Sequence, residues 1–289
     1  MTPFLDKMQY FSADCVQTAL SFVKILLFTK FHTDVPLSVT HPKELVVMGN
    51  GPSLNGLIEK SPSFWQDKCC LMVNFSACSK QFTVVKPELY VVADPYFWLQ
   101  PESTERLFGT ISQTVTWPMH LFMPVRSRSH KTWQELVAKN PNIFLHFYNT
   151  TPVEGFKCIT YPLYKKGWGM PRPHNVLIPA IMLGLRMPFE RLYLAGAEHS
   201  WLSEVMVDDD NTVYYGAKHF YTQQAVQVKA RDHNDQSSKL YEILYHMYVV
   251  FKGYFQIKAY ARYLHKEIFN ITPNSYIDAF ERIKIEPEL

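Results

Sequence analysis

A buried strand that runs straight into a glycine turn is the feature that most constrains this chain. Leu45–Met48 is apolar and partly β-branched, which is typical of a buried strand, and the turn Gly49-Asn50-Gly51-Pro52-Ser53 follows at once. Glycine lets the backbone turn sharply and approach a ligand, and a helix start offers free N–H groups to an anion. The segment therefore predicts an α/β fold with a phosphate-binding turn, although a plain strand-to-helix turn has the same pattern.

Two well-known nucleotide-binding patterns are absent from this turn. The dinucleotide pattern G-x-G-x-x-G requires a third glycine where Leu54 stands, and the G-K-[ST] ending of the phosphate-binding loop of triphosphatases is missing. The turn therefore argues against a dinucleotide and, more weakly, against a nucleoside triphosphate. A nucleoside monophosphate sugar fits it better.

The composition narrows the class of protein further. A chain of 289 residues with 47% hydrophobic residues and a net charge of +3 can form one large domain, and it lacks the basic excess of a nucleic-acid-binding protein. The five cysteines contain no C-x-x-C pair, so we expect reduced thiols in a cytoplasmic protein and no structural zinc site.

The first 42 residues are predicted to be an amphipathic helical extension that precedes a domain of residues 43–289. Its apolar run Val16–Phe28 is interrupted by Lys24 and is shorter than the about 20 residues that a membrane span requires. Asp6 and Asp14 stand where a secretory signal would be basic. Peripheral contact with the inner membrane is one interpretation, and packing on the domain or on another subunit of a homo-oligomer is the other.

Three predicted strands in succession end on polar side chains. The strand that begins at Leu45 ends at Asn50, the next covers Cys69–Asn74, and the third covers Leu89–Asp94. Since ligands bind at the carboxyl ends of parallel strands, Asn50, Asn74 and Asp94 are expected to share one rim of a site.

The rest of the chain completes a single doubly wound, mostly parallel, Rossmann-like sheet. We expect further strands at residues 119–125, 143–147, 191–196 and 255–261, and helices at 175–185, 239–250 and 276–283. Between them, residues 200–238 lose periodicity and become polar and tyrosine-rich, which predicts an irregular lid over the site.

The order of these motifs resembles the bacterial sialyltransferases of the Campylobacter lipooligosaccharide type, over residues 44–280. The resemblance rests on the GNGPSL turn, the strand that ends at Asn74, the helix and strand of residues 178–196 with the sequence RLYLAGAEHSW at 191–201, and Pro273-Asn274-Ser275. A pterin pyrophosphokinase-like group shares the opening turn.

The resemblance implies an inverting, metal-independent glycosyltransferase without a cofactor. It would move sialic acid, or a related keto-sugar such as Kdo, from a CMP donor to a glycan or glycolipid hydroxyl in surface polysaccharide or lipopolysaccharide synthesis. Asn50, Gly51 and Ser53 would hold the phosphate and ribose, Asn74 would contact the nucleotide or donor sugar, and Gly196 and Glu198 would face cytidine. Asp94 stands where the family favours asparagine.

Two further residues stand at the start of the helix predicted at 175–185. Arg172 could meet a carboxylate or phosphate of the donor, although a surface arginine has the same pattern, and Asn175 is included in the predicted donor site.

The predicted lid would carry the catalytic groups. Transfer through an oxocarbenium-like transition state needs a base for the acceptor hydroxyl and hydrogen-bond donors for the departing phosphate. In the resembling family a histidine is the base, which favours His233 just before the helix at 239, with His219 as the alternative. Tyr214 and Tyr215 are the candidate phosphate donors.

Two other functions stay open at this point. Asp208-Asp209-Asp210 could hold a divalent metal, although an acidic turn is the simpler interpretation and we predict no metal. With Asp94, this triplet would suit a magnesium-dependent pterin pyrophosphokinase-like enzyme. A non-catalytic nucleotide-sugar-binding subunit is the third possibility.

Overall fold

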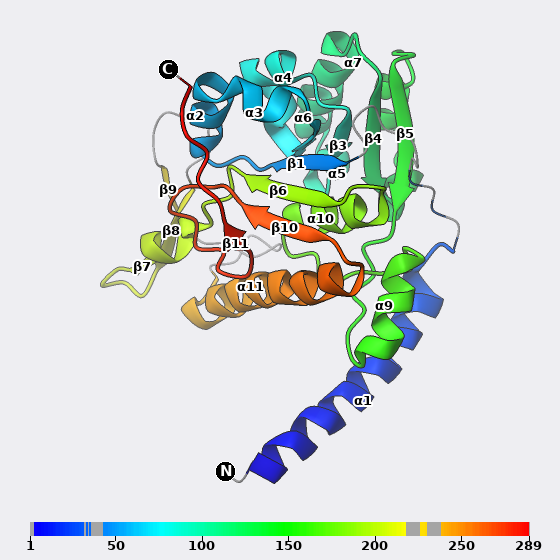
Figure 1. The fold of residues 1–289 in the computed structure, drawn as a ribbon, viewed down its shortest axis with the longest axis vertical. Coiled ribbons are helices and arrows are strands. Elements are labelled where there is room, and N and C mark those ends of the chain that lie inside the picture. Colours follow the sequence, from blue (N-terminus) through cyan, green and yellow to red (C-terminus); the bar gives the residue numbers. More distant parts are fainter. Residues whose placement is uncertain are drawn as a thin grey trace.

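One parallel sheet forms the centre of the molecule (Figure 1). The computed structural model describes residues 3–31, 33, 35, 43–217, 226–229 and 238–288. In these residues eight strands pair in parallel in the order β11-β10-β6-β1-β2-β3-β4-β5. Their bounds are β1 Glu44–Met48, β2 Cys69–Val73, β3 Leu89–Val91, β4 Met119–Pro124, β5 Ile143–Tyr148, β6 Arg191–Ala195, β10 Glu267–Asn270 and β11 Glu281–Arg282.

Helices cover both faces of this sheet (Figure 1). One layer comprises α2 Ser53–Lys60, α3 Pro62–Gln66, α4 Lys80–Val85, α5 Tyr96–Leu99, α6 Pro101–Thr104, α7 Thr110–Thr114 and α8 Lys131–Val137. The opposite layer comprises α9 Lys157–Lys165, α10 Leu177–Arg186 and α11 Leu240–Tyr263. The α1 helix, Pro3–Phe28, packs beside α9 and projects away from the body.

The strands alternate between two hydrophobic cores. Leu45 and Val47 of β1 pack with α10 and α11, whereas Val46 and Met48 pack with the layer of α2 to α8. Because successive side chains of a strand point to opposite faces, a strand covered on both faces must be apolar throughout. This confirms the predicted doubly wound α/β fold and explains the unbroken apolar runs in the sequence.

The order in which strands are added to the sheet reverses beside β1. From β1 the chain builds β2, β3, β4 and β5 outward on one side, and it then returns to place β6 on the other side of β1. The carboxyl ends of β1 and β6 therefore flank the topological switch point, which is the usual place for a ligand in an open α/β sheet.

The end of the chain differs from prediction. Residues 255–261, predicted as a strand, continue α11, because Tyr254, Ile257 and Tyr260 are buried at helical spacing against the sheet. The expected helix at 276–283 is absent. Instead this segment carries the short edge strand β11, and Ile277, Ala279 and Phe280 fill the core beside it.

The described part of the predicted lid is also more regular than expected. A 3-10 turn, Ser200–Glu204, leads into a small antiparallel sheet of β7 Met206–Val207, β8 Val213–Ala217 and β9 Val226–Lys229. The acidic triplet forms the turn between β7 and β8, where Asp208 Oδ1 accepts hydrogen bonds from the N–H groups of Asp210 (3.1 Å) and Thr212 (2.7 Å). These local hydrogen bonds stabilise the turn of a β-hairpin. The hydrophobic periodicity of the sequence did not predict this hairpin.

Candidate functional site

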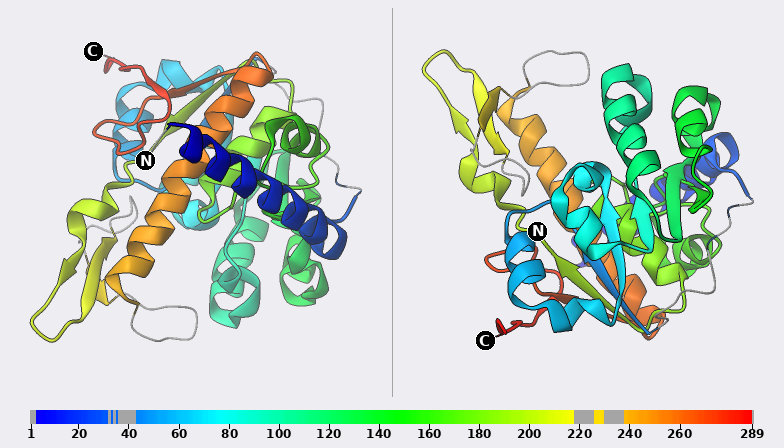
Figure 2. Two further views of the ribbon diagram at one scale, coloured as in Figure 1. Left: turned by 90° about the horizontal axis from the view of Figure 1, so that it is seen from below. Right: turned by 90° about the horizontal axis from the view of Figure 1, so that it is seen from above.

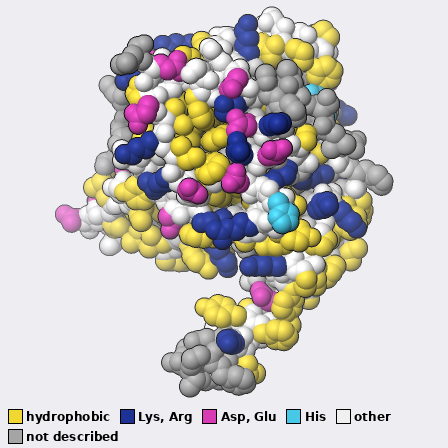
Figure 3. All heavy atoms as spheres, viewed as in Figure 1, with side chains coloured by type: hydrophobic (Ala, Val, Ile, Leu, Met, Phe, Trp, Pro, Cys, Tyr) yellow, Lys and Arg dark blue, Asp and Glu magenta, His cyan; other side chains and the backbone are white. Residues whose placement is uncertain are grey.

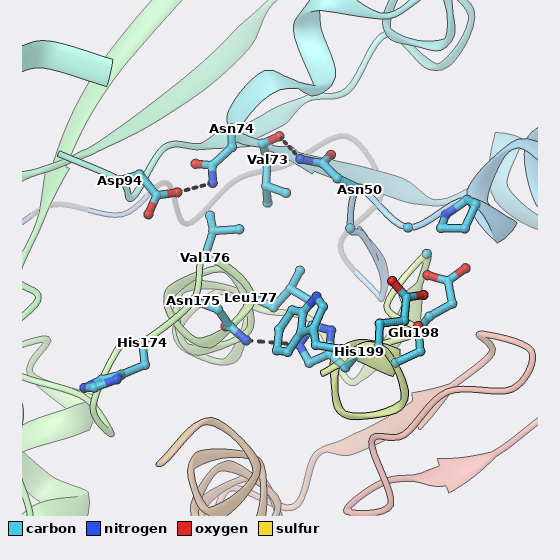
Figure 4. A pocket seen from close by; sticks show the side chains of 17 residues that line it. Asn50, Val73, Asn74, Asp94, His174, Asn175, Val176, Leu177, Glu198 and His199 are labelled. Atoms are coloured by element: carbon cyan, nitrogen blue, oxygen red, sulfur yellow. Dashed lines mark hydrogen bonds between the residues drawn. The ribbon is translucent and has the colours of Figure 1, made fainter. Parts of the chain in front are cut away.

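A cavity of about 360 Å³ opens at the switch point (Figure 4). Four segments line it: the turn after β1, the ends of β2 and β3, the approach to α10, and the segment that follows β6. The lining residues are Gly49–Pro52, Val73, Asn74, Asp94, His174–Leu177, Gly196, Glu198–Trp201 and Glu204. The cavity therefore gathers most of the donor-site residues that the sequence predicts.

The backbone turns after β1 and β6 lie so close together that glycine is needed at positions 49 and 51. Gly49 N–H donates to Ala195 O (2.8 Å), and Gly51 N–H donates to Gly196 O (2.7 Å). A Cβ on Gly49 would lie 2.5 Å from Gly196 O, and one on Gly51 would lie 1.5 Å from Glu198 Oε2. The GNG sequence is thus required to join the turn after β1 to the turn after β6, where Gly196 itself has φ +60°.

The protein's own carboxylate occupies the N-terminus of α2. Glu198 Oε1 accepts a hydrogen bond of 2.7 Å from Ser53 N–H, while Glu198 Oε2 is buried without a hydrogen-bond partner. A helix N-terminus attracts an anion, and here that anion is Glu198. Ser53, predicted to hold the phosphate and ribose, does not line the cavity, whereas Asn50 and Gly51 do.

The three polar strand ends do share one rim, as the sequence predicts (Figure 4). Asn74 Nδ2 donates to Asp94 Oδ2 (2.6 Å), and Asn74 Oδ1 accepts from Ala93 N–H (3.1 Å). Asn50 Oδ1 accepts from Ser76 Oγ (2.5 Å). Burial raises the pKa of the Asp94 carboxyl, and the hydrogen bond from Asn74 opposes that rise.

A buried polar cluster supports the opposite wall. Asn175 Nδ2 donates to Tyr254 Oη (2.8 Å) and lies 3.0 Å from His199 Nε2, which in turn lies 2.7 Å from Tyr254 Oη. Burial lowers the pKa of His199 to about 3. His199 is therefore neutral at physiological pH, and its Nε2 lies within hydrogen-bond distance of both neighbours. Asn175 Oδ1 accepts from Ile178 N–H (3.1 Å), which fixes the start of α10.

Arg172 lies away from the lining of the cavity. Its Nε donates to Glu154 Oε2 at 2.8 Å, and Lys24 of α1 lies 4.0 Å from the same oxygen. The structure thus gives Arg172 a carboxylate of the protein itself as its partner.

The predicted catalytic residues lie largely beyond the described residues. His219, His233 and the side chain of Tyr215 fall outside them. Tyr214 stands on β8 and does not line the cavity, and hydrogen bonding to Asp208 raises the pKa of its phenol.

Two histidines that the sequence did not single out meet at the cavity's edge. His174 lines the cavity, and its Nδ1 lies 3.1 Å from Nδ1 of His246 on α11. Burial, together with His246 and Arg172, lowers the pKa of His174. His174 precedes Asn175 directly, so it could have been found as part of the predicted helix start, whereas nothing in the periodicity of α11 indicates that His246 reaches it.

Trp201 is a further lining residue that the sequence did not identify as functional. Its ring stacks on His199 with centroids 4.1 Å apart. Among the described residues, no three His, Cys, Asp or Glu side chains form a cluster suited to a metal ion.

Few known proteins resemble this chain in sequence or in structure. No protein family and no curated protein matches the sequence. Among solved structures, the Maf glycosyltransferase from Magnetospirillum magneticum AMB-1 is similar with a TM-score of 0.49 and 12% sequence identity. The match covers 95% of this chain and 38% of that protein, so this chain spans well under half of its length.

Proposed function

We propose that this protein is a glycosyltransferase that uses a CMP-activated keto-sugar. The observation that carries the proposal is the cavity at the switch point between β1 and β6, bordered by the glycine turn and by the amides of Asn50, Asn74 and Asn175. Such a place in a doubly wound sheet suits a nucleotide, and amide side chains suit the hydroxyls of a sugar.

The charge of the lining favours a donor with a single phosphate. Asp94, Glu198 and Glu204 line the cavity, and the lining residues of the described chain include no Lys or Arg. A diphosphate or triphosphate would place more negative charge beside these carboxylates, without a compensating cation, than a single phosphate would. This supports CMP over UDP or ATP as the nucleotide of the donor.

The chemistry then requires a base and donors to the leaving phosphate. His233 remains our first choice for the base and His219 the second, with Tyr214 and Tyr215 as donors. His199 is unsuited to the role because burial lowers its pKa to about 3, so the ring is too weakly basic to take the proton of the acceptor hydroxyl. Inversion would follow from direct attack of the acceptor hydroxyl on the face opposite CMP. The acceptor would be a glycan or glycolipid.

A magnesium-dependent pterin pyrophosphokinase-like enzyme is the second candidate. Asp94, Glu198 and Glu204 line one cavity, and although they do not cluster as a metal site by themselves, oxygen ligands of this kind would suit an Mg²⁺ that enters with the phosphates of a nucleotide. In that case the metal would supply the positive charge that the lining lacks.

Turnover assays separate the two functions. The purified protein is incubated with CMP-sialic acid or CMP-Kdo and glycan acceptors, in EDTA and in Mg²⁺, and released CMP is measured. We expect release in EDTA and an inverted anomeric centre in the product. His233→Ala should reduce turnover by at least about 10²-fold. Absence of CMP release from every CMP-sugar, or transfer of pyrophosphate from ATP that requires Mg²⁺, contradicts the proposal.

A further inference from the structure

The side of α1 that faces the protein is narrow and mostly polar. Thr18, Ser21 and the core residue Ile25 are buried on it, Thr29 is buried just after the helix ends, and Ser21 is only 2% exposed. Ser21 Oγ donates to Glu154 O (2.9 Å) and accepts from Glu154 N–H (2.8 Å), so the helix is held by hydrogen bonds to the backbone of the loop before α9. An ordinary surface helix buries its apolar stripe, whereas α1 buries one apolar side chain, Ile25, beside Thr18 and Ser21.

The apolar side of α1 consequently faces away from the body. The exposed apolar residues of this helix, here called the α1 apolar face, are Met8, Tyr10, Phe11, Val16, Leu20, Phe22, Val23, Leu26, Leu27 and Phe28. Figure 3 shows yellow side chains along the part of α1 that projects below the body. An apolar surface of this size is a contact site in a folded protein.

The neighbouring helices carry positive charge. Residues 249–263 of α11 and the whole of α9 contain no Asp or Glu, and they contain Lys157, Lys165, Lys252, Lys258 and Arg262. Lys252 and Lys258 lie over the rings of Tyr248 and Phe255, at 5.4 and 6.0 Å from the ring centroids. Seen from below, α1 and α11 lie in front of the sheet, on the same side of the molecule (Figure 2, left).

Exposed tyrosines on α11 complete a surface with the chemistry of a membrane interface. Tyr241, Tyr245, Tyr248 and Tyr263 are exposed along this helix. Tyrosine and lysine together favour the headgroup region, where the ring is half-buried and the cation meets anionic lipid.

We infer that α1 and α11 together dock this protein on an anionic lipid bilayer. The α1 apolar face enters one leaflet, and the basic, tyrosine-bearing side of α11 rests on the headgroups. This proposal does not depend on the identity of the reaction.

The contacts that α1 makes with the body show whether this helix would lie in one leaflet or span the bilayer. Residues 7–28 are apolar and long enough to span a bilayer by length and composition. However, the half of the helix from Thr18 onward is bound to the body, and Gly155 approaches it so closely that a Cβ there would lie 2.1 Å from Thr18 Oγ1. Residues 3–17 reach only about 22 Å, which is short of the about 30 Å of a hydrocarbon core. The docked helix therefore enters one leaflet only.

Docking of this kind would also place the candidate site near the membrane. His246 of α11 contacts His174, which lines the cavity. One helix thus joins the proposed lipid-facing surface to the edge of the cavity.

Flotation with lipid vesicles tests the docking surface. The full chain is mixed with vesicles of phosphatidylglycerol and phosphatidylethanolamine, or with phosphatidylcholine alone, and the bound fraction is measured. We expect binding to the anionic vesicles at least tenfold tighter than to the neutral ones. The double variant Val23→Asp/Leu27→Asp should lose binding by at least tenfold, and Lys252→Glu/Lys258→Glu should remove the preference for anionic lipid.

A matched control comes from exposed apolar residues elsewhere. Val84 and Leu99 are both 58% exposed, similar to Val23 (52%) and Leu27 (68%), and they lie in the opposite helix layer. Val84→Asp/Leu99→Asp should bind like the wild type. Failure of the wild type to float, or equal loss in the control variant, overturns the proposal. So does a lipid-free dimer, seen by light scattering, that Val23→Asp/Leu27→Asp abolishes while vesicle binding persists.

Discussion

At the scale of single residues, the site depends on the contact between Gly51 and Glu198. Glu198 crosses from the turn after β6 to the N-terminus of α2, and Gly51 leaves room for its carboxylate. This contact joins the two turns that flank the switch point. It also means that any anionic ligand shares this corner with a carboxylate of the protein.

Replacing Gly51 with alanine tests this contact. The new Cβ would meet Glu198 Oε2 at 1.5 Å and Gly196 O at 2.6 Å, so both turns must shift. We expect the free energy of unfolding in urea to fall by about 1–3 kcal/mol. Gly56→Ala is the control, because nothing lies within 4 Å of its Cβ and alanine favours a helix by up to about 1 kcal/mol. Equal stability of the two variants would show that the contact is not tight.

His199 predicts a specific dependence of stability on pH. Burial lowers its pKa from 6.5 to about 3 in the folded protein. Between these two pH values the histidine is protonated in the unfolded chain but neutral in the folded chain. The contribution of His199 to the free energy of unfolding is therefore fully present above pH 6.5. It decreases below pH 6.5 by about 1.4 kcal/mol for each pH unit. Urea unfolding from pH 7.5 to 4.5 should show a shallower loss in His199→Gln than in the wild type. Parallel curves would mean that His199 titrates normally.

The sequence alone brought many of the cavity-lining residues together, for a clear physical reason. Asn50, Asn74 and Asp94 follow apolar strands, and parallel strands bring their carboxyl ends to one edge. The pairing of Ser53 with Glu198, and that of His174 with His246, joins segments far apart in the chain. Such contacts depend on how turns and helices meet in space, which no local pattern contains.

At the scale of elements, local pattern succeeded where both faces of a strand are buried. The predicted strands from Leu45 to residue 196 are confirmed. The central strands are almost wholly apolar because both of their faces are covered, whereas the edge strand β5 is only partly buried. The pattern failed at 255–261 and 276–283. The aromatic and β-branched residues at the end of α11 are typical of a strand. They form a helix because every third or fourth side chain is buried against the rest of the protein.

The hydrogen bonds that hold α1 to the body make their own prediction at this scale. Ser21→Ala leaves the buried N–H and C=O of Glu154 without their side-chain partner, which costs about 1–3 kcal/mol. Hydrogen exchange of the α1 amides around Ser21 should accelerate by about tenfold or more. Ser12→Ala is the matched control, since Ser12 is exposed and its Oγ donates to Gln9 O within the helix. Unchanged exchange in Ser21→Ala would show that these bonds do not hold the helix.

At the scale of the whole molecule, two surfaces define what the protein can do. The first is the cavity at the switch point, and the second is the exposed side of α1 and α11. If both proposals above hold, the protein joins a water-soluble donor to an acceptor at a membrane. The cavity is the central part of this account, because the proposed reaction depends on it.

Calorimetric titration with CMP, UDP, ADP and ATP, in EDTA, tests that part most directly. The account predicts one site for CMP, with the other nucleotides at least about tenfold weaker. Gly51→Ala should lose CMP binding while Gly56→Ala retains it, because only the former disturbs the turn that lines the cavity. Tighter binding of ATP than of CMP, or undiminished CMP binding by Gly51→Ala, would contradict the account.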